Sequence, residues 1–156
     1  GRHGCLEAYA GRAAMEAEAR HRIARGKHSH LLKIMEKKGR TRMSSGVWAK
    51  ALERGDHVAI DLIDRAVWAL GLATASAVNL LDVEAVVIGG GLGTRLGTPF
   101  ADRIRTAMLP HLILPEKAPQ VLSAALGDLG GAMGAALRVE HTVPPPGELG
   151  AVLIED

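Results

Sequence analysis

The chain of 156 residues has little cysteine and few aromatic side chains. Its single cysteine, Cys5, allows no disulfide bond within the chain, so a reducing cytoplasm is the simplest expectation for where it works. Aromatic residues make up only 3% of the chain, so the core must be built mainly from alanine, valine, leucine, isoleucine and methionine.

A long hydrophobic run and an excess of one charge are also missing. The longest mostly apolar stretch, residues 66–81, contains Asn79 and several hydroxyl side chains and is bounded by Arg65 and Asp82. It is too short and too mixed to span a bilayer. The net charge is +2 and the basic residues look scattered along the chain, which gives no sign of a nucleic-acid surface.

An initiator methionine is missing too, and the sequence opens with Gly1-Arg2-His3-Gly4-Cys5, a glycine-rich turn. A chain that begins inside a turn is expected to be a fragment of a longer protein.

The apolar spacing predicts mostly helices with two short buried strands. The longest helix, residues 57–81, is expected to start after Asp56 and to bury a stripe that runs from Ile60 to Leu81 in steps of three and four. A strand is expected at 84–88, where a short β-branched run bounded by turns is typical of a buried parallel strand, and a second buried strand is expected at 120–125. Further helices are expected at 6–25, within 27–42, at 46–54 after Ser44 or Ser45, at 99–109 and at 128–140. This order predicts an α/β fold.

Three glycines, Gly89, Gly90 and Gly91, directly follow the first predicted strand. Glycine lets a backbone approach a ligand closely, and ligands of open α/β sheets lie beyond the carboxyl ends of the strands. The motif fits neither a P-loop nor a dinucleotide fingerprint. A nucleotide contact and a tight strand-to-helix turn therefore both remain open.

The C-terminal part of the chain contains a second glycine-rich turn and a proline-rich tail. Asp128 stands in the second glycine-rich turn, where a helix cap is favoured over a ligand role. The residues after 141 include Pro144-Pro145-Pro146 and are expected to form a poorly ordered tail, in which 152–154 could pair as an edge strand.

Cys5 and Glu7 are the candidate site residues of the opening turn. From the residues alone, Cys5 is better explained as a buried inert thiol than as a metal ligand, because zinc needs about four ligands. Glu7 is better explained as a first-turn acid favoured by the helix dipole, although its two oxygens could accept hydrogen bonds from the hydroxyls of a sugar.

Taken together, these segments resemble the ROK family of repressors and sugar kinases. Residues 1–10 resemble that family's Gly-x-x-Gly-Cys-x-Glu signature, and residues 79–91 resemble its segment ending in Gly-Gly-Gly, with Val83 in place of the usual proline. The runs at 126–128 and 134–136 resemble its C-terminal glycine-rich run. The resemblance covers residues 1 to about 140 in the family's order.

The resemblance implies an actin/hexokinase-like, ribonuclease H-like ATPase fold, with residues 1–141 as its C-terminal lobe. It makes Cys5 one ligand of a structural zinc whose other ligands lie upstream, Glu7 a sugar ligand, and Gly89, Gly90 and Gly91 the adenosine-side loop. The implied activity is phosphorylation of a hexose, glucose first, by ATP with Mg²⁺, in a homodimer or homotetramer. The catalytic aspartate would lie upstream, so the chain alone is expected to be inactive.

The same family contains transcriptional repressors that sense a sugar with this lobe and carry an upstream helix-turn-helix. Nothing in these residues excludes that alternative, and a lobe retained only for assembly also remains open.

Overall fold

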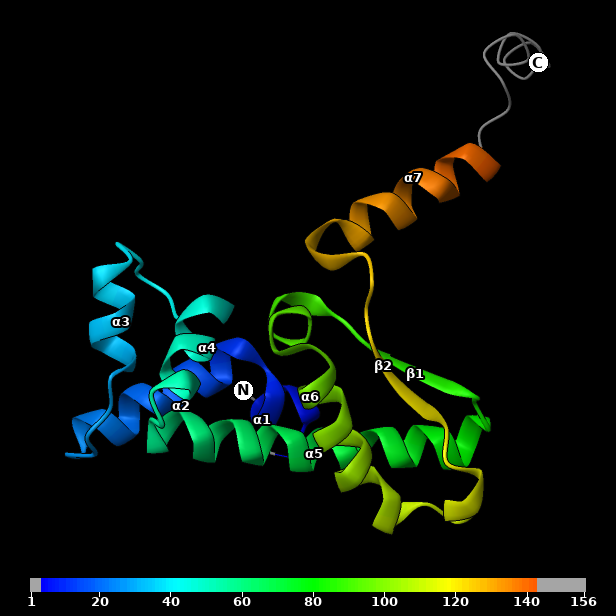
Figure 1. Cartoon of the computed structure of the whole chain (residues 1–156), viewed down its shortest axis with the longest axis horizontal. Coiled ribbons are helices and arrows are strands. Elements are labelled where there is room, and N and C mark those ends of the chain that lie inside the picture. The colour runs from blue at the N-terminus through cyan, green and yellow to red at the C-terminus, as the bar shows by residue number, and fades with distance from the viewer. Residues whose placement is uncertain (1–3, 143–156) are drawn as a thin grey trace, which may run out of the picture.

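The computed structural model describes residues 4–142, which form seven α-helices, three short 3₁₀ turns and two strands within that range. The helices α1 to α5 come first, and the two strands alternate with the later helices (Figure 1). The bounds are α1 Leu6–Ala10, α2 Arg12–Ala24, α3 Leu31–Lys37, α4 Ser45–Glu53, α5 His57–Leu81, β1 Ala85–Ile88, α6 Gly90–Met108, η1 Leu109–His111, η2 Pro115–Lys117, β2 Gln120–Ser123, η3 Gly127–Leu129 and α7 Gly130–Thr142. The proline-rich segment 144–147 and the possible strand 152–154 lie outside the described residues.

The long helix α5 is the spine of the fold, and it has the predicted bounds. Asp56 caps it as expected, because its carboxylate accepts a hydrogen bond of 3.0 Å from the backbone N–H of Ala59. At the other end Asp82 adopts a left-handed conformation with φ 50°, which stops the helix before β1.

The buried stripe of α5 is rotated relative to the predicted one. Leu81 was expected inside but is 65% exposed, and Ile60, Leu70 and Thr74 are only half-buried. Small residues take their place at the most crowded positions, since α5 packs against helices on more than one side and only short side chains fit there. These fully or almost fully buried positions include Ala59, Ala66, Gly71 and Ala75.

The predicted single helix over residues 6–25 is two helices in the structure. Gly11 has an extended backbone, with φ −69° and ψ 134°, and separates α1 from α2. A glycine is favoured here because a Cβ on Gly11 would overlap the backbone carbonyl oxygen of Glu7. The prediction failed because the alanine-rich composition on both sides of Gly11 is equally favourable for helix.

The two strands pair in parallel, as predicted, with Ala85 opposite Gln120 and Ile88 opposite Ser123. Val121 is buried on the inner face of this sheet, whereas the paired residues Val87 and Leu122 on the outer face are 62% and 45% exposed. Parallel sheets are normally covered on both faces, so the outer face is an apolar surface that this chain leaves open.

Helix α6 begins earlier than predicted, directly after the glycine turn. Gly97, with φ 62° and ψ −150°, breaks it into two parts, and the expected start near Pro99 is the start of the second part. Proline is well suited to the first turn of a helix, which explains why the sequence pointed to that position. The first part of the helix, which begins within the glycine turn and ends at Gly97, was not predicted.

Two further predictions concern the third and fourth helices. α3 occupies the middle of residues 27–42, as expected, while Ser44 stands at the N-cap position of α4 without making a side-chain cap hydrogen bond.

Within the described residues, none of the helices has the length and apolar character needed to cross a membrane.

Candidate functional site

The opening turn leads directly into α1. Gly4 has φ 85°, and Cys5 occupies the N-cap position of α1 with an extended backbone and no capping hydrogen bond from its side chain. Cys5 is exposed, so the expectation of a buried inert thiol is wrong. An exposed thiol at a helix start is accessible to partners outside this chain.

Glu7 is an exposed acid in the first turn of α1, and its carboxyl group folds back toward Gly11. No other described residue forms a hydrogen bond or ion pair with that carboxylate. Its position agrees with the helix-dipole explanation, and its free oxygens are equally available to an external donor.

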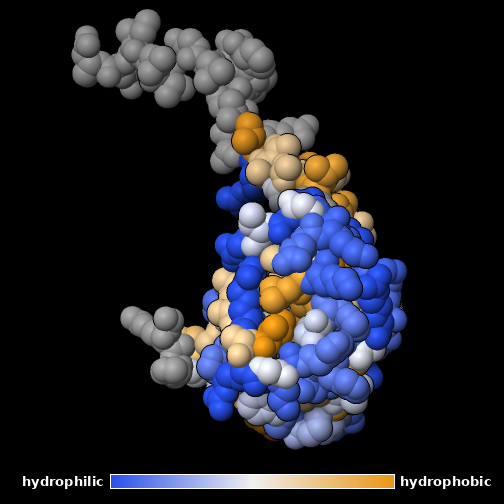
Figure 2. Space-filling model, turned by 90° about the vertical axis from the view of Figure 1, so that its left-hand side faces the viewer, coloured by the Kyte–Doolittle hydropathy of each residue, from blue (hydrophilic) through white to orange (hydrophobic). Residues whose placement is uncertain are grey.

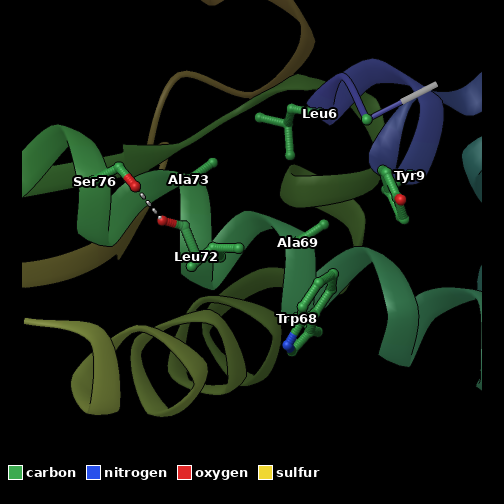
Figure 3. Close-up of a pocket in the computed structure, with 8 residues that line it drawn as sticks. Leu6, Tyr9, Trp68, Ala69, Leu72, Ala73 and Ser76 are labelled. Carbon is green, nitrogen blue, oxygen red and sulfur yellow. Dashed lines mark hydrogen bonds between the residues drawn. The ribbon is translucent and has the colours of Figure 1, made fainter. Parts of the chain in front are cut away.

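An apolar groove lies between α1 and α5, and Figure 3 shows its lining. The groove has a volume of about 300 Å³, and Leu6 and Tyr9 of α1 face Trp68 and Leu72 of α5 across it. No charged side chain lines it among the described residues, and Glu7 is outside it. The groove therefore offers mainly apolar contact, with the hydroxyl groups of Tyr9 and Ser76 among its polar side-chain groups.

One end of this groove is held by a ring cluster that sequence reasoning missed. The rings of Tyr9 and Trp68 are 6.3 Å apart between centroids, and the guanidinium of Arg65 lies 4.6 Å from the centroid of Tyr9. Such cation–π and tilted ring contacts fix the angle between α1 and α5. The signal in the sequence was the spacing of Arg65 and Trp68, which places both on one side of α5.

The predicted glycine turn lies at the carboxyl end of β1. Gly90 has φ 79°, a conformation that favours glycine, and the backbone at Gly93 packs so closely that a Cβ there would be 3.0 Å from Ile88 Cγ2. These glycines therefore have a structural role as a strand-to-helix turn. That role does not exclude a ligand, because Gly91 remains exposed.

A second, more polar cavity opens beside this turn. Its volume is about 320 Å³, and it is lined by Ser45, Gly91, Thr94 and Arg95. The hydroxyl oxygen of Thr94 is buried without a hydrogen-bond partner in the described part of the chain. Sequence reasoning found Gly91 but missed the other three residues, because only the fold brings the start of α4 next to α6.

The N-termini of two helices meet at this cavity. Ser45 is the first residue of α4 and Gly91 is in the first turn of α6, and Ser45 Oγ lies 3.6 Å from where a Cβ of Gly91 would be. Free backbone N–H groups at helix starts favour an anion, and the exposed Arg95 adds a positive charge. The cavity is chemically suited to a phosphorylated or otherwise anionic ligand.

The second glycine-rich turn forms η3, where Gly127 has φ 57°. Residues 128–129 continue this turn, and α7 begins at Gly130, two residues later than predicted. The side chain of Asp128 lies outside what the structure describes, so its expected capping role stays a prediction.

The described residues do not form a complete zinc site by themselves. In the described range 4–142, no three histidine, cysteine, aspartate or glutamate side chains gather as a metal site would require. Cys5 can contribute at most one ligand.

Two buried carboxylates lie away from both cavities. Burial raises the pKa of Glu16, but hydrogen bonds from Arg20, the Met43 N–H and Arg42 outweigh it and leave that pKa below its ordinary value. Asp56 has the same balance, with backbone N–H donors from His30 and Ala59. Both groups hold loops against helices, which is a structural role.

Thus the structure does not bring all the predicted site residues into one place. Glu7 lies on α1, and the glycine turn lies between β1 and α6. Gly91 lines the polar cavity, whereas Glu7 lines neither that cavity nor the apolar groove.

Comparison with known proteins identifies relatives of this chain. An N-acetyl-D-glucosamine kinase of Escherichia fergusonii is 38% identical over 87 residues, which are 54% of this chain and 27% of that protein. The chain therefore spans only about a quarter of the length of that curated relative.

Solved structures match over more of the chain. A ROK family glucokinase from Streptomyces griseus, in complex with glucose and AMPPNP, has a TM-score of 0.72 and 29% identity, covering 90% of this chain and 46% of its own. A ROK hexokinase from Thermus thermophilus has a TM-score of 0.63 and 27% identity, covering 88% and 42%. The fold is thus a mostly helical α/β part of an actin-like ATPase fold. Residues 1–142 match the ROK family, and the chain belongs to that family of sugar kinases and their relatives.

Proposed function

We propose that this chain is the C-terminal lobe of an ATP-dependent hexose kinase that converts glucose to glucose 6-phosphate. The observation that carries the proposal is the cavity where α4 and α6 begin, at the carboxyl end of β1. Ligands of open α/β sheets bind at such an edge. The Streptomyces griseus glucokinase, which shares this fold, was solved with glucose and AMPPNP.

In this proposal the cavity takes the nucleotide. Gly89, Gly90 and Gly91 let the backbone approach the adenosine side, because side chains there would occupy the space. Arg95 supplies positive charge, and the unpaired hydroxyl of Thr94 supplies a hydrogen bond. Mg²⁺, when bound together with ATP, would supply positive charge that offsets the negative charge of the phosphates.

Glu7 is the proposed sugar ligand. Its carboxylate is exposed and unengaged within the described residues, so it can accept hydrogen bonds from two sugar hydroxyls. Cys5 is proposed as one of four zinc ligands, the other three coming from a part of the protein upstream of Gly1. The base that deprotonates the sugar hydroxyl is also proposed to lie upstream, so this chain alone should not turn over sugar.

Calorimetric titration of the chain with AMPPNP tests the nucleotide part. Gly91→Val should weaken binding at least about tenfold, since a branched side chain would fill the cavity next to Ser45. Gly131→Val, at a position with open space around it on α7, is the matched control and should bind like the parent. Equal affinity of both variants would contradict the assignment.

A coupled assay on residues 1–156 tests the division of labour. Glucose and N-acetylglucosamine should both remain unphosphorylated, and activity with either would show that the catalytic base lies in this chain.

A further inference from the structure

The basic residues are less scattered than the small net charge suggests. Residues 12–54, which form α2, α3, α4 and their connections, contain twelve of the 19 lysines and arginines but only four carboxylates. This segment therefore carries a formal charge of +8 in a chain whose total is +2. The structure adds that the helices of this contiguous segment gather at one end of the molecule.

These cations lie on the surface and most lack a carboxylate partner. Eleven of the twelve are exposed, and Arg22 is half-buried. Glu16 pairs with Arg20 and Arg42, Glu18 with Arg22, and Glu53 with Lys50, while Asp61 of α5, outside the segment, also pairs with Arg22 at 3.7 Å. The cations without an ion-pair partner among the described residues are Arg12, Arg25, Lys27, Lys33, Lys37, Lys38, Arg40 and Arg54.

The segment forms one end of the molecule, at the left of Figure 1. Figure 2 faces this end, and hydrophilic residues cover most of it around a narrow hydrophobic strip near its centre. A recess of about 370 Å³ lies at the end of α2, lined by His21, Arg22, Arg25, Lys27 and Glu18. Glu18 accepts a hydrogen bond of 2.8 Å from Arg22, so Arg25 and Lys27 keep their charge uncompensated there.

The character of this surface narrows the class of partner. None of the large exposed apolar side chains lies in residues 12–54, so there is nothing to insert into a lipid bilayer. Trp48, the one aromatic Phe, Tyr or Trp residue of the segment, is fully buried, so bases of a single strand have no ring to stack on. An unpaired, polar and basic surface of this kind is suited to contact with the regularly spaced phosphates of a nucleic-acid backbone.

We propose that this basic surface, residues 12–54, binds the phosphate backbone of double-stranded nucleic acid without reading its sequence. Each cation that meets a phosphate releases a condensed counterion, which drives such binding. The proposal does not rest on the kinase function, because it uses neither Glu7 nor the cavity at Gly91.

The test is the fluorescence anisotropy of a short labelled DNA duplex titrated with the full chain, at salt concentrations from about 50 to 200 mM. Affinity should fall linearly with salt on a log–log plot. Arg25→Gln with Lys27→Gln should reduce the slope by about 2 and weaken binding at about 100 mM salt by at least about tenfold.

The matched control is Arg105→Gln with Lys117→Gln, which removes the same charge from exposed positions outside the basic surface. It should bind within about twofold of the parent. No binding at the lowest salt, equal losses in both double variants, or tighter binding of a single strand or of anionic vesicles would overturn the proposal. Unchanged AMPPNP titration and circular dichroism in both variants separate this result from the kinase proposal and from misfolding.

Discussion

Gly71 on α5 lies directly against Ala107 on α6. A Cβ at Gly71 would be 2.6 Å from Ala107 Cβ and 2.7 Å from its carbonyl carbon, closer than van der Waals contact permits. α5 and α6 can therefore cross at this distance only because position 71 has no side chain. The crossing sets where α6 runs, and hence where the glycine turn before it meets α4.

Gly71→Ala should therefore destabilise the chain by about 1–2 kcal/mol. Overpacking of this kind costs about 1–3 kcal/mol, and the better helix propensity of alanine returns up to about 1 kcal/mol. Urea denaturation followed by circular dichroism measures the change. Gly131→Ala on α7, where a methyl group meets nothing within 4 Å, is the control and should show no loss. A Gly71→Ala chain as stable as that control would mean that the helices are not in this contact.

Asp56 links the connection before α3 to the start of α5. One carboxylate oxygen accepts the Ala59 N–H, and the other accepts the backbone N–H of His30 and, at 2.9 Å, the hydroxyl of Ser29. Asp56→Ala should cost about 2 kcal/mol or more, because it removes an N-cap and leaves buried donors unsatisfied. Asp56→Asn keeps an acceptor and should cost less.

Thermal unfolding of these two variants beside Ser29→Ala checks the ranking. Ser29→Ala removes its hydrogen bond to Asp56 and the one of 3.2 Å that it accepts from the Leu31 N–H, but it leaves the cap of α5 in place and should be milder than Asp56→Ala. If Asp56→Ala were no worse than Ser29→Ala, the capping role of Asp56 would be wrong.

Much of the fold could be predicted because local signals were strong. Asp56 in front of a long helical spacing of apolar residues located α5, and a short β-branched run located β1. Gly11 and Gly97 were missed as helix breaks because their neighbours favour helix and only the backbone conformation reveals the interruption.

The candidate site was predicted only in part, for a different reason. Gly91 could be found from its motif, whereas Ser45 is 46 positions earlier and reaches the same cavity through the packing of α4 on α6. The contacts of Glu16 with Arg42 and Met43, and the contact of Tyr9 with Trp68, likewise join segments far apart in the sequence. No periodicity within one segment encodes such contacts.

Metal content tests the proposed role of Cys5. A four-ligand structural site requires three more ligands, which the described residues do not provide. Residues 1–156 alone should therefore hold far less than one zinc per chain, while a protein that includes the upstream ligands should hold about one. Inductively coupled plasma mass spectrometry measures both. Stoichiometric zinc in residues 1–156, abolished by Cys5→Ser, would show that the ligand set was wrongly assigned.

Glu16 predicts a specific dependence of stability on pH. Its carboxylate binds Arg20 at 2.8 Å, Arg42 at 3.1 Å and the Met43 N–H at 3.0 Å, and so holds the connection between α3 and α4 against α2. The folded-state pKa is lowered from its ordinary value of 4.5. Folding then favours the ionised form, so the stabilisation is complete above pH 4.5 and is lost as the pH falls through the lower, folded-state pKa.

Glu16→Gln should accordingly be about 1–3 kcal/mol less stable than the parent at pH 7, because charge-assisted hydrogen bonds are replaced by weaker neutral ones. The gap between parent and variant should narrow as the pH is lowered below 4.5, where the parent also loses its charge. Urea denaturation at a series of pH values measures this gap. Glu36→Gln, at an exposed position on α3, is the control and should give no gap at any pH. A Glu16→Gln gap that stays constant down to acid pH would show that packing, and not the ionised carboxylate, holds this connection in place.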